Sequence, residues 1–164
     1  MKKVEINVYN FNELDSKIKE NLVKKEIEKQ TNLYCECFLK DDMEEKSRIL
    51  LEKYFKNNAN FINVFYDLSY SQGSGAMIEF DLLYNKKHCE IKNYGHYCHE
   101  RSFEINSDVD LTDKEFSRLN KKIISMNEEL EKFGYQSIEN CISKEEAIEI
   151  LEYHNYFSNG EIFE

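Results

Sequence analysis

Two short segments in the middle of the chain carry residue types that could bind a ligand or transfer protons. The first, residues 70–76, reads Tyr-Ser-Gln-Gly-Ser-Gly-Ala and holds two of the five glycines. Glycines in such a loop accept a positive φ or let a backbone or ligand approach closely. The second, residues 95–101, reads Gly-His-Tyr-Cys-His-Glu-Arg and places imidazole, carboxyl and guanidinium groups in one run. If the segments converge, they could form an acid–base or ligand-binding site from side chains such as Gln72, Ser74, His99 and Glu100.

Both segments also have a structural explanation that needs no chemistry. A bulged hairpin is enough to explain the two glycines of residues 73–75. They do not form a dinucleotide-binding motif, because that motif carries a third glycine and stands at the start of a helix. A zinc site drawn from Cys89, His96, Cys98 and His99 matches no standard ligand spacing. The five cysteines are an odd number, which favours reduced thiols over a disulfide framework. We therefore expect no metal ion and no cofactor.

The charge of the chain is acidic and unevenly distributed. Lys plus Arg number 22 and Asp plus Glu 32, for a formal net charge of −10. Residues 1–60 are balanced, 61–106 carry −2 and 107–164 carry −8. This balance disfavours a nucleic-acid backbone as partner, because a phosphate-binding surface is basic. The acidic end is explained either by a solvated face or by a surface that binds a basic site on another protein.

The strongest patterns lie in the middle of the chain. Apolar residues alternate with polar ones over 62–70 and 76–82, and further strands are predicted over 88–92 and 97–105. Short connections between them favour an antiparallel meander of about four to five strands. Together with the helices, this pattern predicts an α+β fold.

Helical patterns flank the strands on both sides. A short strand over 4–8 is followed by a helix that Asn12 could cap, and a second helix begins at Asp41 or Asp42. The segment 33–38 is ambiguous between helix and turn. Towards the C-terminus, capping boxes at Thr112-x-x-Glu115 and Ser143-x-x-Glu146 open two acidic helices, the first ending at Gly134. With no Pro/Gly/Ser-rich linker and no repeat, residues 1–164 are predicted to form a single α+β domain.

The two central segments together resemble a family of small phage and prophage proteins. Members of that family carry Tyr-Ser-Gln-Gly-Asp-Gly-Ala, followed by Gly-x-Tyr-x-His-Glu, and the match here spans residues 65–105. Ser74 stands where those proteins usually have Asp. The resemblance implies a mobile-element origin, and small acidic phage proteins are often inhibitors of host defence.

We therefore expect an inhibitor of a bacterial defence system, with an anti-CRISPR protein as the favoured case. It would bind stoichiometrically through an acidic surface to the basic nucleic-acid-binding site of an effector protein or ribonucleoprotein. The candidate binding residues comprise the motif positions and the acidic C-terminal side chains: Gln72, Gly73, Ser74, Gly75, Tyr97, His99, Glu100, Glu128, Glu129, Glu131, Glu145, Glu146, Glu149 and Glu152.

Two other functions remain open at this point. A small enzyme or ligand-binding protein would use Gln72, Ser74, His99 and Glu100, and an oligomeric phage accessory protein would use its Tyr- and Phe-rich surface for self-contacts. We expect no direct nucleic-acid binding, because the chain is acidic. We also expect no membrane association, because no apolar run approaches the length of a membrane span. The expected location is the cytoplasm of the bacterial host, and the oligomeric state is left open.

Overall fold

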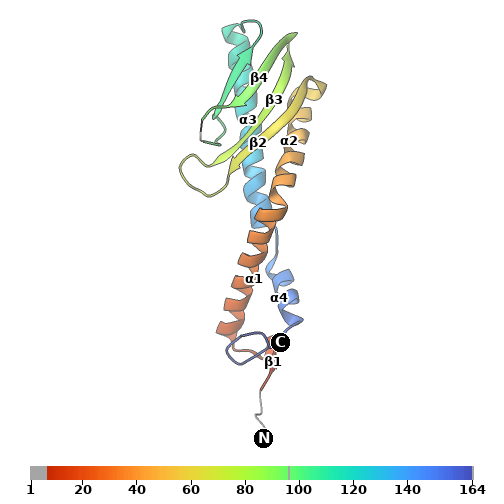
Figure 1. Cartoon of the computed structure of the whole chain (residues 1–164), viewed down its shortest axis with the longest axis vertical. Coiled ribbons are helices and arrows are strands. Elements are labelled where there is room, and N and C mark those ends of the chain that lie inside the picture. Colours follow the sequence, from red (N-terminus) through yellow and green to blue (C-terminus); the bar gives the residue numbers. More distant parts are fainter. Residues whose placement is uncertain (1–6, 96, 164) are drawn as a thin grey trace. The chain divides into compact units, whose positions relative to one another are not determined.

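The computed structural model describes residues 7–95 and 97–163 (Figure 1). These residues divide into two compact units. The helical unit comprises the chain up to residue 37 and from 139 onward, and the sheet unit comprises residues 38–138. That residues 1–164 fold as one domain stays a prediction, which cooperative unfolding of both units would test.

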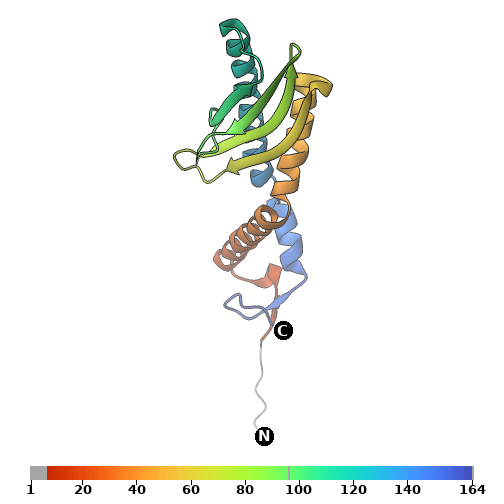
Figure 2. The same ribbon diagram turned by 45° about the horizontal axis from the view of Figure 1, so that its top comes forward.

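The sheet unit is built on a four-stranded antiparallel meander, which confirms the predicted α+β class. Its strands, in the order β2-β3-β4-β5, are β2 (Ala59–Asp67), β3 (Gly75–Tyr84), β4 (Lys87–Asn93) and β5 (Phe103–Ser107). Helices α2 (Leu39–Phe55) and α3 (Asp113–Glu139) both lie behind the sheet in Figure 2. One face of the sheet is thus covered by helices.

The covered face carries the hydrophobic core of this unit. Val64 pairs with Ile78 and Phe80 pairs with Ile91, and all four side chains are buried. The two helices contribute further buried side chains, namely Met43, Leu50, Leu51, Phe55, Leu119, Ile123, Met126 and Leu130. Burial of one such side chain is worth about 1.5–3 kcal/mol, so sheet and helices stabilise one another.

The opposite face of the sheet has no helix over it (Figure 2). Strand alternation sends most of the charged residues of β3, β4 and β5 to this side. Asp81 lies directly across from Glu90, and Lys92 lies across from Glu104. We call the side chains of Glu79, Asp81, Glu90, Lys92 and Glu104 the open acidic face.

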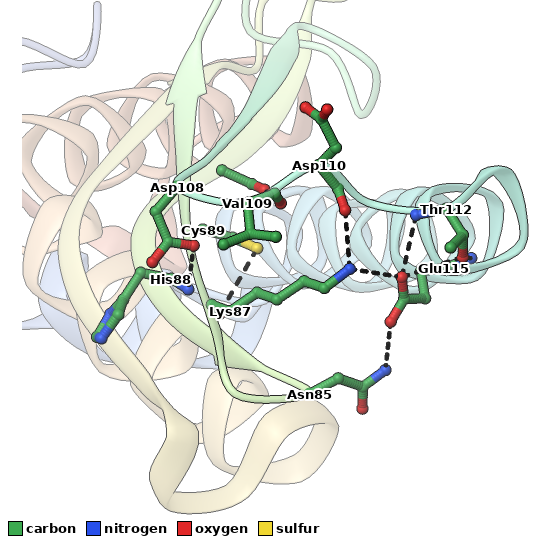
Figure 3. Close-up of polar contacts among 10 residues, drawn as sticks. Asn85, Lys87, His88, Cys89, Asp108, Val109, Asp110, Thr112 and Glu115 are labelled. Atoms are coloured by element: carbon green, nitrogen blue, oxygen red, sulfur yellow. Dashed lines mark hydrogen bonds and ion pairs between the residues drawn. The ribbon is translucent and has the colours of Figure 1, made fainter.

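A polar cluster fastens the start of β4 to the start of α3 (Figure 3). The Lys87 ammonium donates to the Asp110 carbonyl (2.8 Å) and lies 2.9 Å from a Glu115 carboxylate oxygen. The same carboxylate closes the predicted capping box by accepting from the Thr112 N–H (3.0 Å), and its other oxygen accepts from Asn85 (3.1 Å). These hydrogen bonds lower the pKa of Glu115 from 4.5 to about 2, and the one from Lys87 contributes most.

Several predicted boundaries in this unit are wrong. The first strand of the meander, predicted over 62–70, runs over Ala59–Asp67. The fourth strand begins at Phe103 instead of residue 97, because the chain before it forms a loop in which the Tyr94 N–H donates to the Ser102 carbonyl (2.9 Å). Gly134 does not end α3, which continues to Glu139. A Cβ at Gly134 would lie 2.6 Å from Leu68 Cδ1, so the missing side chain at this position lets Leu68 pack closely against α3.

The helical unit packs α1 (Ser16–Cys37) and α4 (Lys144–Glu152) around a small core. Its strands β1 (Tyr9–Asn10) and β6 (Asn155–Tyr156) form a two-stranded antiparallel ladder. The buried members of the core are Phe11, Leu14, Val23, Ala147, Leu151 and Tyr156. The predicted Ser143–Glu146 capping box is confirmed, with the Glu146 N–H donating to Ser143 Oγ at 3.1 Å.

The N-terminal helix boundaries differ from those predicted. Asn10, not Asn12, caps a single 3-10 turn over Phe11–Glu13, and α1 begins after Asp15, whose carboxylate accepts from the Lys17 N–H. The ambiguous segment 33–38 continues α1 as far as Cys37, and α2 begins at Leu39, before both predicted starts, Asp41 and Asp42. Residues 4–6 of the strand predicted over 4–8 lie outside the described residues, and the prediction is wrong for Asn7 and Val8, because the first strand, β1, begins at Tyr9.

Candidate functional site

The structure brings the two central segments into direct contact beside α3. The Cys98 N–H donates to the Gly73 carbonyl at 3.2 Å. The Tyr97 ring covers Gly73 so closely that an added Cβ would lie 2.1 Å from ring atom Cδ1. At Gly75, an added Cβ would lie 2.7 Å from the Cα of His99. Both glycines are therefore required for close approach between the segments.

Hydroxyl groups hold the glycine-rich loop in shape. The Ser74 hydroxyl accepts from the Ser71 N–H (2.9 Å) and lies within hydrogen-bond distance of the Ser71 and Ser69 hydroxyls. Asp67 accepts from the Ser69 N–H (3.0 Å), and hydrogen bonds from Ser69 lower the pKa of Asp67. Ser74 thus closes the loop, while Gln72 at its tip is exposed.

The acid–base residues of the second segment are engaged with one another. His99 Nδ1 accepts from the Arg101 N–H (3.2 Å) and lies 3.8 Å from a Glu100 carboxylate oxygen. The Arg101 guanidinium pairs with Glu100 at 3.1 Å. Because Nδ1 accepts this hydrogen bond, the neutral imidazole of His99 carries its hydrogen on Nε2. These contacts shape the turn and leave Nε2 as the available donor.

Asn127 anchors this turn from α3, and sequence reasoning missed it. Its side chain is fully buried, accepts from the Ile78 N–H (3.2 Å) and donates to the Glu100 carbonyl (3.1 Å). The signal available was its position: Asn127 follows Ile123 by four residues, on the apolar stripe where a hydrophobic side chain is expected.

Glu131 lies beside the contact between the segments. Its carboxylate would be 3.2 Å from a Cβ at Gly75. Burial, followed by repulsion from Glu100 and Glu128, raises the pKa of Glu131, and His99 acts in the opposite direction. Within the described ranges it forms neither a hydrogen bond nor an ion pair. Glu131 is therefore a carboxylate whose charge is left uncompensated.

The remaining acidic candidates have different surroundings. On α3, Glu128 is exposed, whereas the Glu129 carboxylate pairs with Lys53 at 2.6 Å and accepts from Tyr54 at 3.0 Å. On α4, Glu146 belongs to the capping box and Glu152 accepts from Asn12 (2.9 Å). Glu145 and Glu149 are exposed on the same helix. The α3 residues belong to the sheet unit and the α4 residues to the helical unit.

Sequence reasoning also overlooked the open acidic face as a site. Its carboxylates were treated only as the polar half of an alternating pattern, although the register sets Asp81 opposite Glu90. Lys92 is the one lysine or arginine among the face positions of the described strands, and it lies 2.7 Å from Glu90. That hydrogen bond raises the pKa of Lys92, with further contributions from Glu79 and Asp81. Four carboxylates thus surround one ammonium.

Three of the five cysteines do not resemble activated nucleophiles. Burial raises the pKa of Cys35, Cys89 and Cys98, which keeps these thiols protonated at neutral pH. Among the described residues, no group of three or more His, Cys, Asp and Glu side chains could hold a metal ion. No helix in the part of the chain that the structure covers is long and apolar enough to cross a membrane.

Comparison of the chain with protein-family models, curated proteins and solved structures found no match.

Proposed function

We propose that this protein inhibits a bacterial defence effector by stoichiometric binding, with a CRISPR effector as the favoured target. The observation that carries the proposal is the open acidic face, where Asp81 and Glu90 stand directly opposite each other on an uncovered sheet surface. Like charges in this position are destabilising, so a fold maintained for stability alone would not favour them.

The partner that this face fits is a basic site that normally holds nucleic acid. Ordered carboxylates on neighbouring strands offer hydrogen-bond acceptors to Arg and Lys, as phosphates do. A CRISPR effector holds its guide–target duplex in a positively charged channel. The choice of a defence effector over other basic proteins comes from the phage-protein resemblance of residues 70–76 and 95–100.

Competition with target DNA tests this proposal. A guide-loaded CRISPR effector from the bacterial host is mixed with labelled target DNA and increasing amounts of the protein, at low and moderate salt. We expect loss of DNA binding at near-equimolar protein, with inhibition weakening as salt rises. An Asp81→Asn/Glu90→Gln variant should inhibit less, whereas Glu145→Gln/Glu149→Gln on α4 should behave as wild type. Full inhibition by the first variant would refute the assignment of this face.

The convergence of His99, Glu100 and Glu131 near Gly75 supports a second candidate, a small enzyme or ligand-binding protein. An uncompensated carboxyl next to an imidazole is an arrangement suited to proton transfer. Saturation-transfer NMR with a library of small metabolites tests it. A hit whose signal is abolished by His99→Gln but retained by His88→Gln would favour this candidate over the inhibitor.

A further inference from the structure

A stacked aromatic pair with one exposed ring lies next to the uncompensated Glu131 carboxylate. Tyr70, in the glycine-rich loop, is 74% exposed and stacks on Tyr135 of α3 with ring centroids 4.4 Å apart and planes inclined by 25°. Exposed tyrosines with a fixed partner offer contact area at little cost in conformational entropy, which is why binding surfaces are rich in them.

Carboxylates surround this ring pair. Glu131 precedes Tyr135 by four residues and therefore lies on the same side of α3. Burial first, and then the charge of Glu131, raise the pKa of the Tyr135 phenol; a hydrogen bond with the Tyr70 backbone lowers it, and the charges of Tyr70 and Asp67 raise it by smaller amounts. Asp67 accepts from the Ser69 N–H. The surface thus combines aromatic faces with two negative charges.

We propose that Tyr70, Tyr135 and Glu131 form a recognition site for an arginine side chain of the partner protein. A guanidinium stacks on an aromatic face and makes two parallel hydrogen bonds to one carboxylate, so a single arginine satisfies both features. Lysine would gain the charge interaction without the planar stacking. A nucleic-acid strand would also stack on the rings, but Asp67 and Glu131 repel its phosphates.

This inference rests on the proposed function, because it names a group on the same basic partner. It is independent of the open acidic face, which belongs to the opposite side of the sheet from α3 (Figure 2). A test that uses no effector therefore separates the two. If arginine recognition fails while DNA competition succeeds, only this inference falls.

The probe is a short glycine–arginine repeat peptide, added to the isotope-labelled full chain and followed by NMR. We expect the largest shift changes at the amides of Tyr70, Gly75 and Tyr135, and weaker binding of the matching glycine–lysine peptide. Tyr70→Ala and Glu131→Gln should each weaken arginine-peptide binding about three- to tenfold. Tyr70→Phe keeps the stack and should bind as wild type, which separates loss of the ring from loss of the fold.

Matched controls are an exposed tyrosine and an exposed glutamate elsewhere. Tyr153→Ala and Glu28→Gln, both in the helical unit, should leave peptide affinity unchanged. Equal losses in Tyr70→Ala and Tyr153→Ala would overturn the proposal. So would peptide shifts confined to the open acidic face, or tighter binding of a single-stranded oligothymidylate than of the arginine peptide.

Discussion

Replacing three glycines one at a time by alanine separates backbone strain from steric contact at the candidate site. Gly73 and Gly95 share a φ of +92°, but a Cβ at Gly95 meets nothing within 4 Å, whereas at Gly73 it meets the Tyr97 ring. Gly75, with φ +149°, would place its Cβ against the His99 backbone. We expect destabilisation to increase in the order Gly95→Ala, Gly73→Ala, Gly75→Ala.

The magnitudes follow from separate contributions. The positive φ costs an alanine about 1–2 kcal/mol, and reduced freedom of the unfolded chain offsets roughly 0.4–1 kcal/mol of that. Gly95→Ala should therefore lose between about 0 and 1.6 kcal/mol. Displacing a packed ring or backbone adds roughly 1–3 kcal/mol, with Gly75→Ala at the upper end because backbone yields less readily than a side chain.

Urea unfolding followed by tyrosine fluorescence measures these differences, since the chain has no tryptophan. Hydrogen exchange at the Cys98 amide, which donates to Gly73, reports whether the two segments have separated. We expect faster Cys98 exchange in Gly73→Ala and Gly75→Ala and no change in Gly95→Ala. If Gly75→Ala were no less stable than Gly95→Ala, the close approach of residues 73–75 to residues 97–99 would be refuted.

Three further predictions concern other parts of the sheet unit. Asn127→Ala should lose about 2–4 kcal/mol in urea unfolding, because it leaves the buried Ile78 N–H and the Glu100 carbonyl without their partner; a loss below about 1 kcal/mol would contradict the bridging role. Glu115 has a folded pKa of about 2, below its ordinary 4.5, so its contribution is present above pH 4.5 and is lost as the pH falls towards 2. Glu115→Gln should flatten that part of the pH–stability curve, and an unchanged acid slope would count against the Lys87–Glu115 pair. Asp81→Asn should raise stability by roughly 0.2–1 kcal/mol by removing the repulsion with Glu90, and a lowered Tm would show that the pair is not repulsive in the folded protein.

The parts of the fold that were predictable from sequence are those decided by local patterns. Alternation located the first three strands of the meander, and the two capping boxes located the starts of α3 and α4. Gly134 failed as a helix stop because tertiary packing against Leu68 decides its role. The loop before β5 failed for the same reason, since the buried Asn127 holds Glu100 where alternation alone would continue a strand.

The candidate site depended on contacts that no spacing rule contains. The sequence identifies residues 70–76 and 95–101 as unusual. Only the fold shows that Tyr97 packs against Gly73 and that the His99 backbone packs against Gly75. Neighbouring glutamates on α3 illustrate the limit. Glu129 is neutralised by Lys53 from another helix, whereas Glu131 lies beside the loops and pairs with no lysine or arginine of the described residues. A run of acidic residues therefore predicts charge, and the tertiary partners decide which carboxylates remain available.

The distribution of those available carboxylates argues for a binding role over simple solubility. Solubility requires only that charges of both signs be interspersed on the surface. Here Asp81 and Glu90 face each other on the sheet. The single positive charge of Lys92 cannot neutralise the four carboxylates of Glu79, Asp81, Glu90 and Glu104. Removing one of these charges should improve stability and weaken binding to a basic partner at the same time. A gain in stability combined with a loss of binding is expected where a surface is maintained for a partner. For a face that serves solubility alone, removing the charge would leave binding unchanged.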